Sequence, residues 1–295
     1  MTDDERAIIH SYGGGVQSAA IAVLVVQGKL PRPARIVMAD TGREATLTWS
    51  YLRNCVQPLL AEIGLEVEVA SHDLALVDLH AKSGDGRPLF PVFTDTGGRL
   101  PNLCSVEWKR RVVGRWLRAQ GYGPKRPVVQ WLGISKDEVH RAKPSDLLWA
   151  SLDFPLLDLN LSRADCVRLV EKAGLPTPPR SSCWMCPFRS DVEWTALKNR
   201  GDGDWQKAVK MDEHIRGDGT GGAPDPDCKR CEGTGRLDEC DPRGPAGNFT
   251  HERCSCVVGG LLYLHRSAKP LADVEFRHEK QGDLFDVCEE GRCEF

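Results

Sequence analysis

Apolar segments of two alternating lengths fill the first 71 residues, and this alternation constrains the fold more than any other feature of the sequence. Short apolar runs typical of buried strands occupy residues 7–12, 34–40 and 65–71, and longer runs typical of helices occupy residues 16–28 and 46–63. Strands that alternate with helices at this spacing pair in parallel, with the helices on the faces of the sheet. The sequence therefore predicts an α/β fold with a doubly wound, mostly parallel, Rossmann-like sheet.

The alternation of element types continues further along the chain. A Gly- and Pro-rich stretch with the composition of an active-site loop is followed by a basic helix, a buried strand and a second helix, at residues 84–102, 105–119, 127–134 and 162–174, respectively. Ser162 is the expected N-cap of the last helix. Asp165 stands at the N3 position, where it completes a capping box in place of the usual Glu or Gln.

Charge and apolar content exclude several classes of protein. The chain has 295 residues, with 39 Lys and Arg against 42 Asp and Glu, a formal net charge of −3. That balance argues against a protein that coats nucleic acid through charge alone. No apolar run reaches the roughly 18 residues of a membrane span, and the acidic start is unlike a signal peptide. We expect a cytoplasmic protein with no membrane partner, and a homodimer is compatible with the sequence.

Three consecutive glycines join the first strand to the first helix. Glycines let a backbone approach a ligand closely, and the N–H groups of a helix N-terminus attract phosphate. Gly13, Gly14, Gly15 and the hydroxyl of Ser18 are therefore a candidate phosphate site, although a tight turn without a ligand would use the same residues. The segment is neither a Walker A motif nor a GxGxxG dinucleotide fingerprint.

Close cysteine pairs point to metal or redox chemistry in a reducing compartment. The chain has 12 cysteines, and the close pairs among them are Cys183–Cys186, Cys228–Cys231 and Cys254–Cys256. Residues 228–235 resemble the CxxCxGxG element of DnaJ-type zinc modules. Four thiolates around zinc would stabilise a segment that has little apolar sequence of its own. The last two pairs therefore predict a structural zinc site, with a mobile loop of free thiols as the alternative.

Composition divides the chain into three regions. Residues 1–216 carry the strand and helix pattern and form the predicted nucleotide-binding α/β domain. Residues 217–258 hold many Gly and Pro and form the predicted Cys-rich, zinc-binding insertion. Residues 259–295 form a C-terminal tail, expected to return to the core, that contains the segment CEEGRC.

Four segments in this order resemble the PP-loop ATP pyrophosphatase superfamily, also described as adenine nucleotide alpha-hydrolase-like, and within it the phosphoadenosine-phosphosulfate-reductase-like branch. They are SYGGGVQS at 11–18, MADTGRE at 38–44, LGISKDEVHRAK at 132–143 and SSCWMCPFRSDVEW at 181–194. The resemblance covers residues 7–216 and implies a PP-loop type of α/β fold. It also implies an adenine nucleotide, ATP or phosphoadenosine phosphosulfate, at the carboxyl edge of the sheet.

The resemblance also assigns residues to that nucleotide. The implied contacts come from the glycine turn, from the end of the second strand and from the segment after residue 132. They are Ser11, Gly13, Gly14, Gly15, Gln17, Ser18, Asp40, Thr41, Gly133, Lys136 and Arg141. Gln17 stands where the family has an aspartate. This departure puts magnesium-assisted ATP cleavage in doubt, but not nucleotide binding.

The basic helix allows two interpretations. Its cations line a solvated face, or Lys109 and Arg110 reach a sulfate, a phosphate or a nucleic-acid backbone. In sequences of the family, a cysteine followed by such a pair lies near the nucleotide. The resemblance therefore favours the second interpretation for Lys109 and Arg110, beside Cys104.

The pair Cys183 and Cys186 would need further ligands to hold a metal. Cys104 is the candidate third ligand, and Cys288 or Cys293 the fourth. The resemblance to thiolating and reducing relatives implies a [4Fe–4S] cluster, and a structural zinc or metal-free thiols remain as alternatives.

Two enzyme chemistries fit this sequence. A reductase would attack the sulfur of phosphoadenosine phosphosulfate with a thiolate of Cys288 or Cys293. A thiotransferase would use ATP to adenylate an oxygen of a nucleic acid or nucleobase, and would then deliver sulfide from the cluster. The alternative from another class is a zinc-containing nucleic-acid-binding module that keeps the nucleotide fold as a scaffold.

Overall fold

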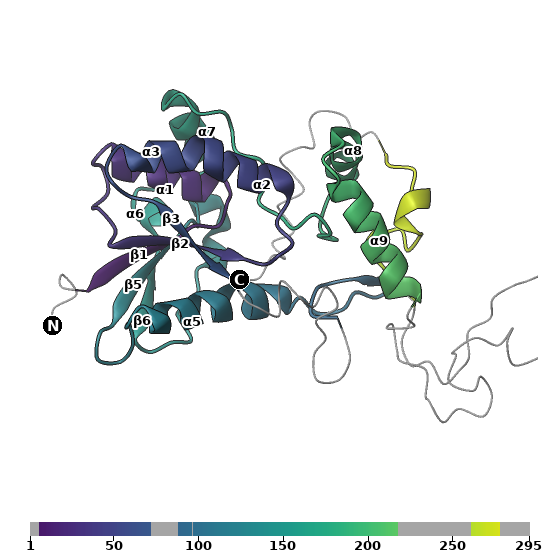
Figure 1. Cartoon of the computed structure of the whole chain (residues 1–295), viewed down its shortest axis with the longest axis horizontal. Coiled ribbons are helices and arrows are strands. Elements are labelled where there is room, and N and C mark those ends of the chain that lie inside the picture. Colours follow the sequence, from purple (N-terminus) through teal and green to yellow (C-terminus); the bar gives the residue numbers. More distant parts are fainter. Residues whose placement is uncertain (1–5, 72–87, 96, 218–260, 278–295) are drawn as a thin grey trace, which may run out of the picture. The chain divides into compact units, whose positions relative to one another are not determined.

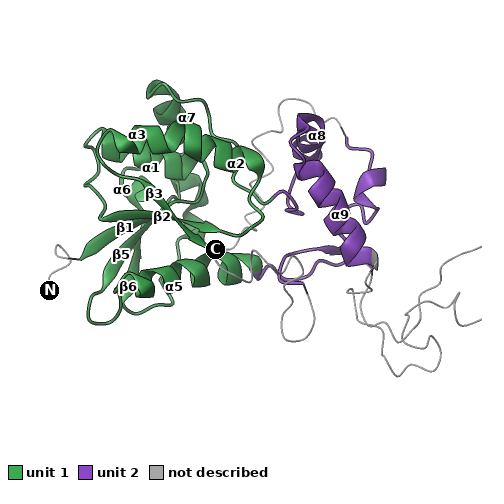
Figure 2. Ribbon diagram, viewed as in Figure 1, with its two compact units in different colours: residues 1–79, 104–183, 288–295 green, residues 80–103, 184–287 purple. Residues whose placement is uncertain are grey.

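The computed structural model describes residues 6–71, 88–95, 97–217 and 261–277 (Figure 1). Figure 2 shows its two compact units, residues 1–79, 104–183 and 288–295 in the first and residues 80–103 and 184–287 in the second. The predicted zinc cysteines and the CEEGRC tail fall in residues 218–260 and 278–295, which lie outside the described residues. The predicted domain boundaries therefore stay predictions.

The first unit is built on a five-stranded sheet. In spatial order its strands are β3 (Val67–Ser71), β2 (Arg35–Asp40), β1 (Ala7–Ser11), β5 (Val128–Leu132) and β6 (Ala150–Asp153). Every neighbouring pair is parallel. This arrangement confirms the predicted α/β class with a Rossmann-like sheet.

Helices connect the strands of the first unit. They are α1 (Val16–Val26), α2 (Thr46–Tyr51), α3 (Gln57–Ala61), α5 (Arg111–Ala119), α6 (Pro155–Asp158) and α7 (Arg163–Lys172). The predicted helix at 46–63 contains a π-helical segment, Leu52–Val56, and the predicted helix at 105–119 begins with another, Ser105–Arg110. A short 3₁₀ helix, Lys136–Arg141, follows β5. Single π-helical turns are frequent at functional sites, so the second segment is of interest below.

Two apolar clusters cover the two faces of the sheet. Helix α1 is buried along almost its whole length and shares one cluster with residues of α3, α6 and α7. Val112, Val113 and Leu117 of α5 pack against Ile9 and Val37 in the other. Figure 1 shows α1, α3 and α7 on one side of the sheet and α5 on the other. Burial on both faces explains why the inner strands β1 and β2 are mostly apolar.

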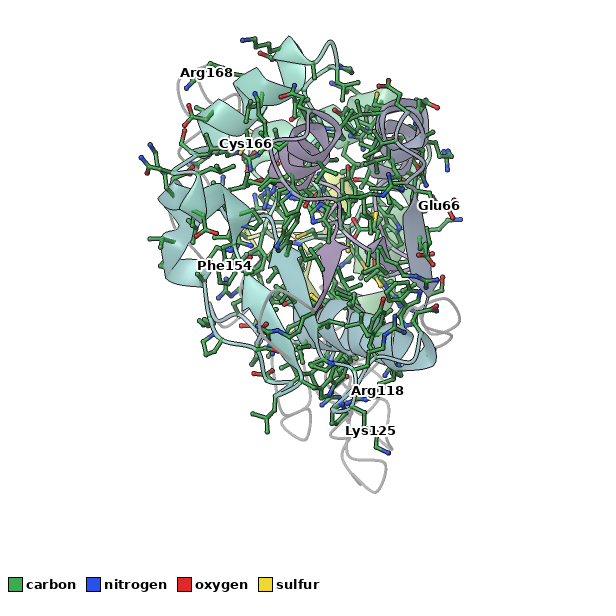
Figure 3. All side chains as sticks on the ribbon, turned by 90° about the vertical axis from the view of Figure 1, so that its left-hand side faces the viewer. Glu66, Arg118, Lys125, Phe154, Cys166 and Arg168 are labelled. Atoms are coloured by element: carbon green, nitrogen blue, oxygen red, sulfur yellow. The ribbon has the colours of Figure 1, made fainter. Side chains whose placement is uncertain are left out.

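Helix α7 begins as the sequence predicts. The Ser162 side chain accepts the N–H of Asp165, and the Asp165 carboxylate accepts the N–H of Ser162, which forms a complete capping box. Cys166 on this helix is fully buried, whereas Arg168 projects outward (Figure 3). Cys166 therefore packs as a small hydrophobic residue.

The described residues of the second unit form the helices α8 (Asp191–Arg200) and α9 (Asp204–Gly217) and an antiparallel pair of short strands, β4 (Phe93–Thr94) and β7 (Leu262–Tyr263). A 3₁₀ turn, Leu271–Asp273, follows β7. The buried Asp212 carboxylate on α9 accepts the backbone N–H groups of Leu264 and Leu271, each at 2.8 Å. In the parts of the chain that the structure describes, no helix is long and apolar enough to cross a membrane.

Candidate functional site

The glycine turn lies between the carboxyl end of β1 and the first turn of α1. Gly14 has φ +78, and a Cβ atom placed there would lie 2.7 Å from Thr48 Cγ2, so only glycine fits without strain. The N–H of Gly13 donates to the Ser18 hydroxyl at 2.9 Å. No side chain of the described residues caps the N-terminus of α1, where Gly15 is the N-cap. The turn therefore brings bare backbone to the positive end of a buried helix, as an anion site requires.

Gly133 packs against the same helix N-terminus. A Cβ atom at this position would lie 3.0 Å from the Ser18 backbone nitrogen and 3.1 Å from Gln17 Cβ. Gly133 directly follows β5, the neighbour of β1 on the side away from β2. Ligands of open α/β sheets bind where the strand order reverses, and the β1–β5 edge is that point in this sheet. The predicted contacts Gly13, Gly14, Gly15, Ser18 and Gly133 are thus brought together.

Gln17 connects three elements beside this turn. Its amide nitrogen donates to Glu138 Oε2 at 3.2 Å and to the Ser135 hydroxyl at 3.5 Å, and its amide oxygen accepts from Arg163 Nη1 at 3.2 Å. Arg141 donates to the same Glu138 carboxylate at 2.8 Å. A carboxylate of the 3₁₀ helix, that of Glu138, therefore lies next to Gln17.

The remaining predicted contacts are more dispersed. The Ser11 hydroxyl donates to Gln130 Oε1 at 3.3 Å, and Lys136 is exposed at the start of the 3₁₀ helix. Asp40 accepts the N–H of Gly42 at 2.7 Å, which shapes the turn after β2. Thr41 is fully buried, and its hydroxyl lies 3.7 Å from Cys183 Sγ. Thr41, the residue directly after β2, therefore contacts a cysteine and is not exposed to solvent.

Ser181 links the paired-cysteine segment to the glycine turn. Its hydroxyl donates a hydrogen bond to the Gly13 carbonyl, and its Cβ lies 3.6 Å from the position a Cβ of Gly15 would take. Two residues further on, Cys183 forms an isolated antiparallel bridge with Glu44. The segment before Cys183 is therefore held by the glycine turn on one side and by the turn after β2 on the other.

Each of the two cations predicted to bind an anion has a carboxylate partner. Lys109 Nζ lies 3.3 Å from Glu44 Oε1, and Arg110 pairs with Asp146. Burial acts to lower the pKa of Lys109, but attraction to Glu44 and then to the thiols of Cys183 and Cys104 outweighs it, so the pKa lies above its usual value. Lys109 is therefore a charged ammonium within electrostatic reach of both cysteines.

Two more cations of the basic helix contact groups of their own chain. Arg111 pairs with Glu107 at 2.6 Å, and the Arg118 guanidinium lies 5.5 Å from the centre of the Trp149 ring. These contacts reduce the charge that the helix presents to an external polyanion.

The described cysteines do not assemble a metal site by themselves. Cys104 and Cys183 belong to the first unit and Cys186 to the second. No group of three or more His, Cys, Asp or Glu side chains with the geometry of a metal site occurs among the described residues. The other predicted ligands, Cys228, Cys231, Cys254, Cys256, Cys288 and Cys293, lie outside the described residues. We therefore derive no chemical step through a metal.

His10 supports the first turn of α1 from below. The ring is fully buried on β1, and its Nε2 lies 3.3 Å from the Ser18 carbonyl oxygen. Burial lowers the pKa of His10 to about 4, because an imidazolium would lose its hydration there. The histidine is therefore neutral near pH 7.

Sequence reasoning did not single out Glu44, Arg43 or Ser181 as site residues. Glu44 and Ser181 lie inside the segments that carry the family resemblance, and that position was the available signal. The Arg43 guanidinium lies 4.2 Å from the centre of the Trp108 ring, and both side chains are buried. Pairings over such sequence distances depend on strand order and are invisible in a linear pattern.

Comparison with known proteins gives a likeness of fold. No protein-family model matches the chain, and no curated protein matches it in sequence. Among solved structures, the phosphoadenylyl-sulfate reductase from Candida auris, in a phosphate complex, is 13% identical with a TM-score of 0.40. That match covers 60% of this chain and 81% of the reductase.

A second solved structure is similar at the same level. The U34-tRNA thiolase NcsA from Methanococcus maripaludis, solved with its [4Fe–4S] cluster, is 16% identical with a TM-score of 0.41. The match covers 78% of this chain and 76% of the thiolase.

Proposed function

We propose that the chain binds an adenine nucleotide at the glycine turn and carries out nucleotide-dependent sulfur chemistry beside it. The observation that carries the proposal is the hydrogen bond from Ser181 to the Gly13 carbonyl. Ser181 thus contacts the proposed phosphate site, and Cys183 lies only two positions after Ser181 in the chain. Nucleotide and thiol chemistry need such proximity, because a reacting group gains most of its rate from being held in place.

The phosphates would bind to the backbone of Gly13, Gly14 and Gly15 and to the first turn of α1. Three features support this: the lack of a side-chain cap at the helix N-terminus among the described residues, the left-handed Gly14, and the close approach of Gly133. Lys136 is exposed on the neighbouring 3₁₀ helix and would contact phosphate oxygens. The adenosine would lie towards Asp40 at the end of β2.

The sulfur step would occur beside Lys109. An ammonium near two thiols stabilises an anionic sulfur species, whether this is a thiolate or a bound hydrosulfide. In the first chemistry, an acceptor oxygen attacks the α-phosphorus of ATP, pyrophosphate leaves, and the sulfur nucleophile then displaces AMP. In the second, a thiolate attacks the sulfur of phosphoadenosine phosphosulfate and displaces the phosphoadenosine phosphate. A second thiol then attacks the cysteine sulfur of the resulting thiosulfonate, so that a disulfide forms and sulfite leaves.

A [4Fe–4S] cluster at Cys104, Cys183, Cys186 and a tail cysteine stays a separate prediction. Such a cluster would supply an iron that binds the sulfur to be transferred. Cys104 and Cys183 are suitable thiol ligands for the cluster, but the complete set of ligands includes a tail cysteine that lies outside the described residues. Neither chemistry above requires the cluster for nucleotide binding.

Product analysis tests the proposal. The protein would be incubated anaerobically with ATP, hydrosulfide and a nucleic-acid acceptor, or with phosphoadenosine phosphosulfate and a dithiol, and pyrophosphate, AMP and sulfite would be measured. We expect release either of pyrophosphate and AMP or of sulfite, and loss of the AMP or of the sulfite in Cys183→Ala, because Cys183 belongs to the sulfur step. Cys55→Ala is the matched control, because Cys55 lies in the π-helical segment Leu52–Val56 and has no role in the proposed chemistry. Release of neither product, combined with salt-dependent nucleic-acid binding, would instead support the binding-module function.

A further inference from the structure

The ion pair between Glu44 and Lys109 is unequally exposed. The Glu44 side chain is 1% exposed and the Lys109 side chain 28% exposed, with 3.3 Å between Oε1 and Nζ. The second carboxylate oxygen, Oε2, is buried and has no hydrogen-bond partner among the described residues. The carboxylate therefore lies behind the ammonium and has Lys109 as its ion-pair partner, while the ammonium keeps a side that a ligand can reach.

A pair of this kind contributes little to stability by itself. Removing two charges from water costs about as much as their attraction returns, and an apolar pair of similar volume is often equally stable. An unsatisfied buried carboxylate oxygen adds a further penalty. The pair therefore matters for the position in which it holds the Lys109 ammonium, rather than for stability.

The neighbouring residues fix both partners. The Arg43 guanidinium stacks on Trp108 at 4.2 Å, so the adjacent residues Arg43 and Glu44 contact the adjacent residues Trp108 and Lys109. This double contact ties the turn after β2 to the π-helical segment Ser105–Arg110, directly after Cys104.

The other side of the same turn holds the second cysteine. Glu44 forms an antiparallel bridge with Cys183, and the N–H of Ala45 donates to the Ser182 carbonyl at 3.3 Å. Residues 41–45 therefore support two cysteines that are 79 positions apart in the chain (183 − 104). The Lys109 ammonium lies within electrostatic reach of both.

We propose that Glu44 is a positioning residue that holds the Lys109 ammonium beside Cys104 and Cys183, and so fixes the place where an anionic sulfur species binds. This assignment rests on the proposed sulfur chemistry and adds to it a residue that makes no contact with the nucleotide. The anion would be a small inorganic sulfur species, hydrosulfide or sulfite, because Lys109 presents only one partly exposed ammonium face.

Three variants distinguish a positioning role of Glu44 from a role in supporting the fold. Glu44→Gln removes the charge at constant shape, Glu44→Asp keeps the charge on a shorter side chain, and Glu44→Met with Lys109→Met removes both charges together. We expect Glu44→Gln to raise the KM for hydrosulfide by about tenfold to a hundredfold, with the KM for ATP unchanged. Glu44→Asp, the conservative variant, should raise the KM for hydrosulfide less than Glu44→Gln does.

The double Met variant is the control for stability. It should melt at a higher temperature than either single Met variant, because neither charge is left buried alone. Its KM for hydrosulfide should nevertheless stay raised, because no ammonium is left to bind the anion. Recovery of the hydrosulfide KM in the double variant, or a wild-type KM in Glu44→Gln, would overturn the positioning role.

Direct anion binding keeps the inference separate from the proposed function. Sodium sulfite would be titrated against the wild type and the Glu44 variants, with the melting temperature as the readout. If the wild type turns over no nucleotide but sulfite protects it and fails to protect Glu44→Gln, the proposed function is wrong and the positioning role stands. If sulfite protects both equally, the positioning role is wrong.

Discussion

The Ser181 hydroxyl donates a hydrogen bond to the Gly13 carbonyl, and this contact joins the two most distinctive segments of the sequence. One segment is the glycine turn at the start of α1, and the other leads to Cys183. They are 168 residues apart in the chain, and the sheet brings them to one edge. The proposed function depends on this juxtaposition more than on either segment alone.

Gly14→Ala tests the shape of the glycine turn. The substitution places a Cβ 2.7 Å from Thr48 Cγ2 at a residue with φ +78. Backbone strain and the steric conflict together should destabilise the fold by about 2–4 kcal/mol. Chemical denaturation measures this loss.

Two further variants serve as controls for Gly14. Gly28 has φ +68, and a Cβ placed there would meet nothing within 4 Å, so Gly28→Ala should cost only the strain, about 1 kcal/mol. Adding Thr48→Ser to Gly14→Ala removes the clashing methyl group and should restore part of the stability. Equal losses in Gly14→Ala and Gly28→Ala would show that the turn is not tightly packed.

Gln17→Asp tests the amide that stands in the aspartate position. The change removes the donor to Glu138 and brings two carboxylates together, since Gln17 Nε2 lies 3.2 Å from Glu138 Oε2. We expect a loss of about 1–3 kcal/mol, measured by urea unfolding. Combining it with Glu138→Gln exchanges donor and acceptor, and should recover most of the loss. A double variant no more stable than Gln17→Asp would argue against the contact.

His10 should make stability depend on pH in the acid range. The pKa of His10 is about 4 in the folded chain and has its ordinary value of 6.5 in the unfolded chain. As the pH falls, the unfolded chain therefore binds a proton before the folded chain does. Protonation therefore favours unfolding between pH 6.5 and 4, and the loss approaches about 3 kcal/mol near pH 4. His10→Gln should flatten this part of the stability profile. An unchanged profile in the variant would assign the acid sensitivity to other groups.

Asp212 organises the second unit. Its carboxylate accepts the N–H groups of Leu264 and Leu271 and the Nε–H of Arg216, at 2.8, 2.8 and 3.1 Å. The amide of Asp212→Asn offers one acceptor oxygen and turns a donor towards the other N–H. We expect a loss of about 1–3 kcal/mol in this unit. Hydrogen exchange should accelerate at residues 262–273 and stay unchanged in β1 and β2; acceleration in those strands would contradict local support.

The fold was predictable where local chemistry decides it. The strands β1 and β2 lie inside the sheet and are largely buried, so their sequences are apolar and recognisable. Ser162 and Asp165 indicated the start of α7 through the capping box. Strand β6, with the sequence ASLD, carries no apolar run and was missed, because its place in the sheet comes from pairing with β5.

The candidate site was predictable only in part, for the same reason. The glycines and cysteines have distinctive spacing, and they were found. Glu44 was missed because its partner Lys109 is 65 positions away (109 − 44) and the pairing depends on how the turn after β2 meets the π-helical segment. The partners of Arg110 and Gln17 depend in the same way on tertiary contacts.

The most direct test of the central claim is calorimetric titration of ATP and of phosphoadenosine phosphosulfate into the wild-type protein, Gly28→Ala, and Gly14→Ala with Thr48→Ser. The account predicts that one nucleotide binds the first two with the same affinity. It predicts binding at least about tenfold weaker in the third, because a side chain then stands where the backbone approaches phosphate. Failure of the wild type to bind either nucleotide, or equal binding by all three folded proteins, would contradict the claim.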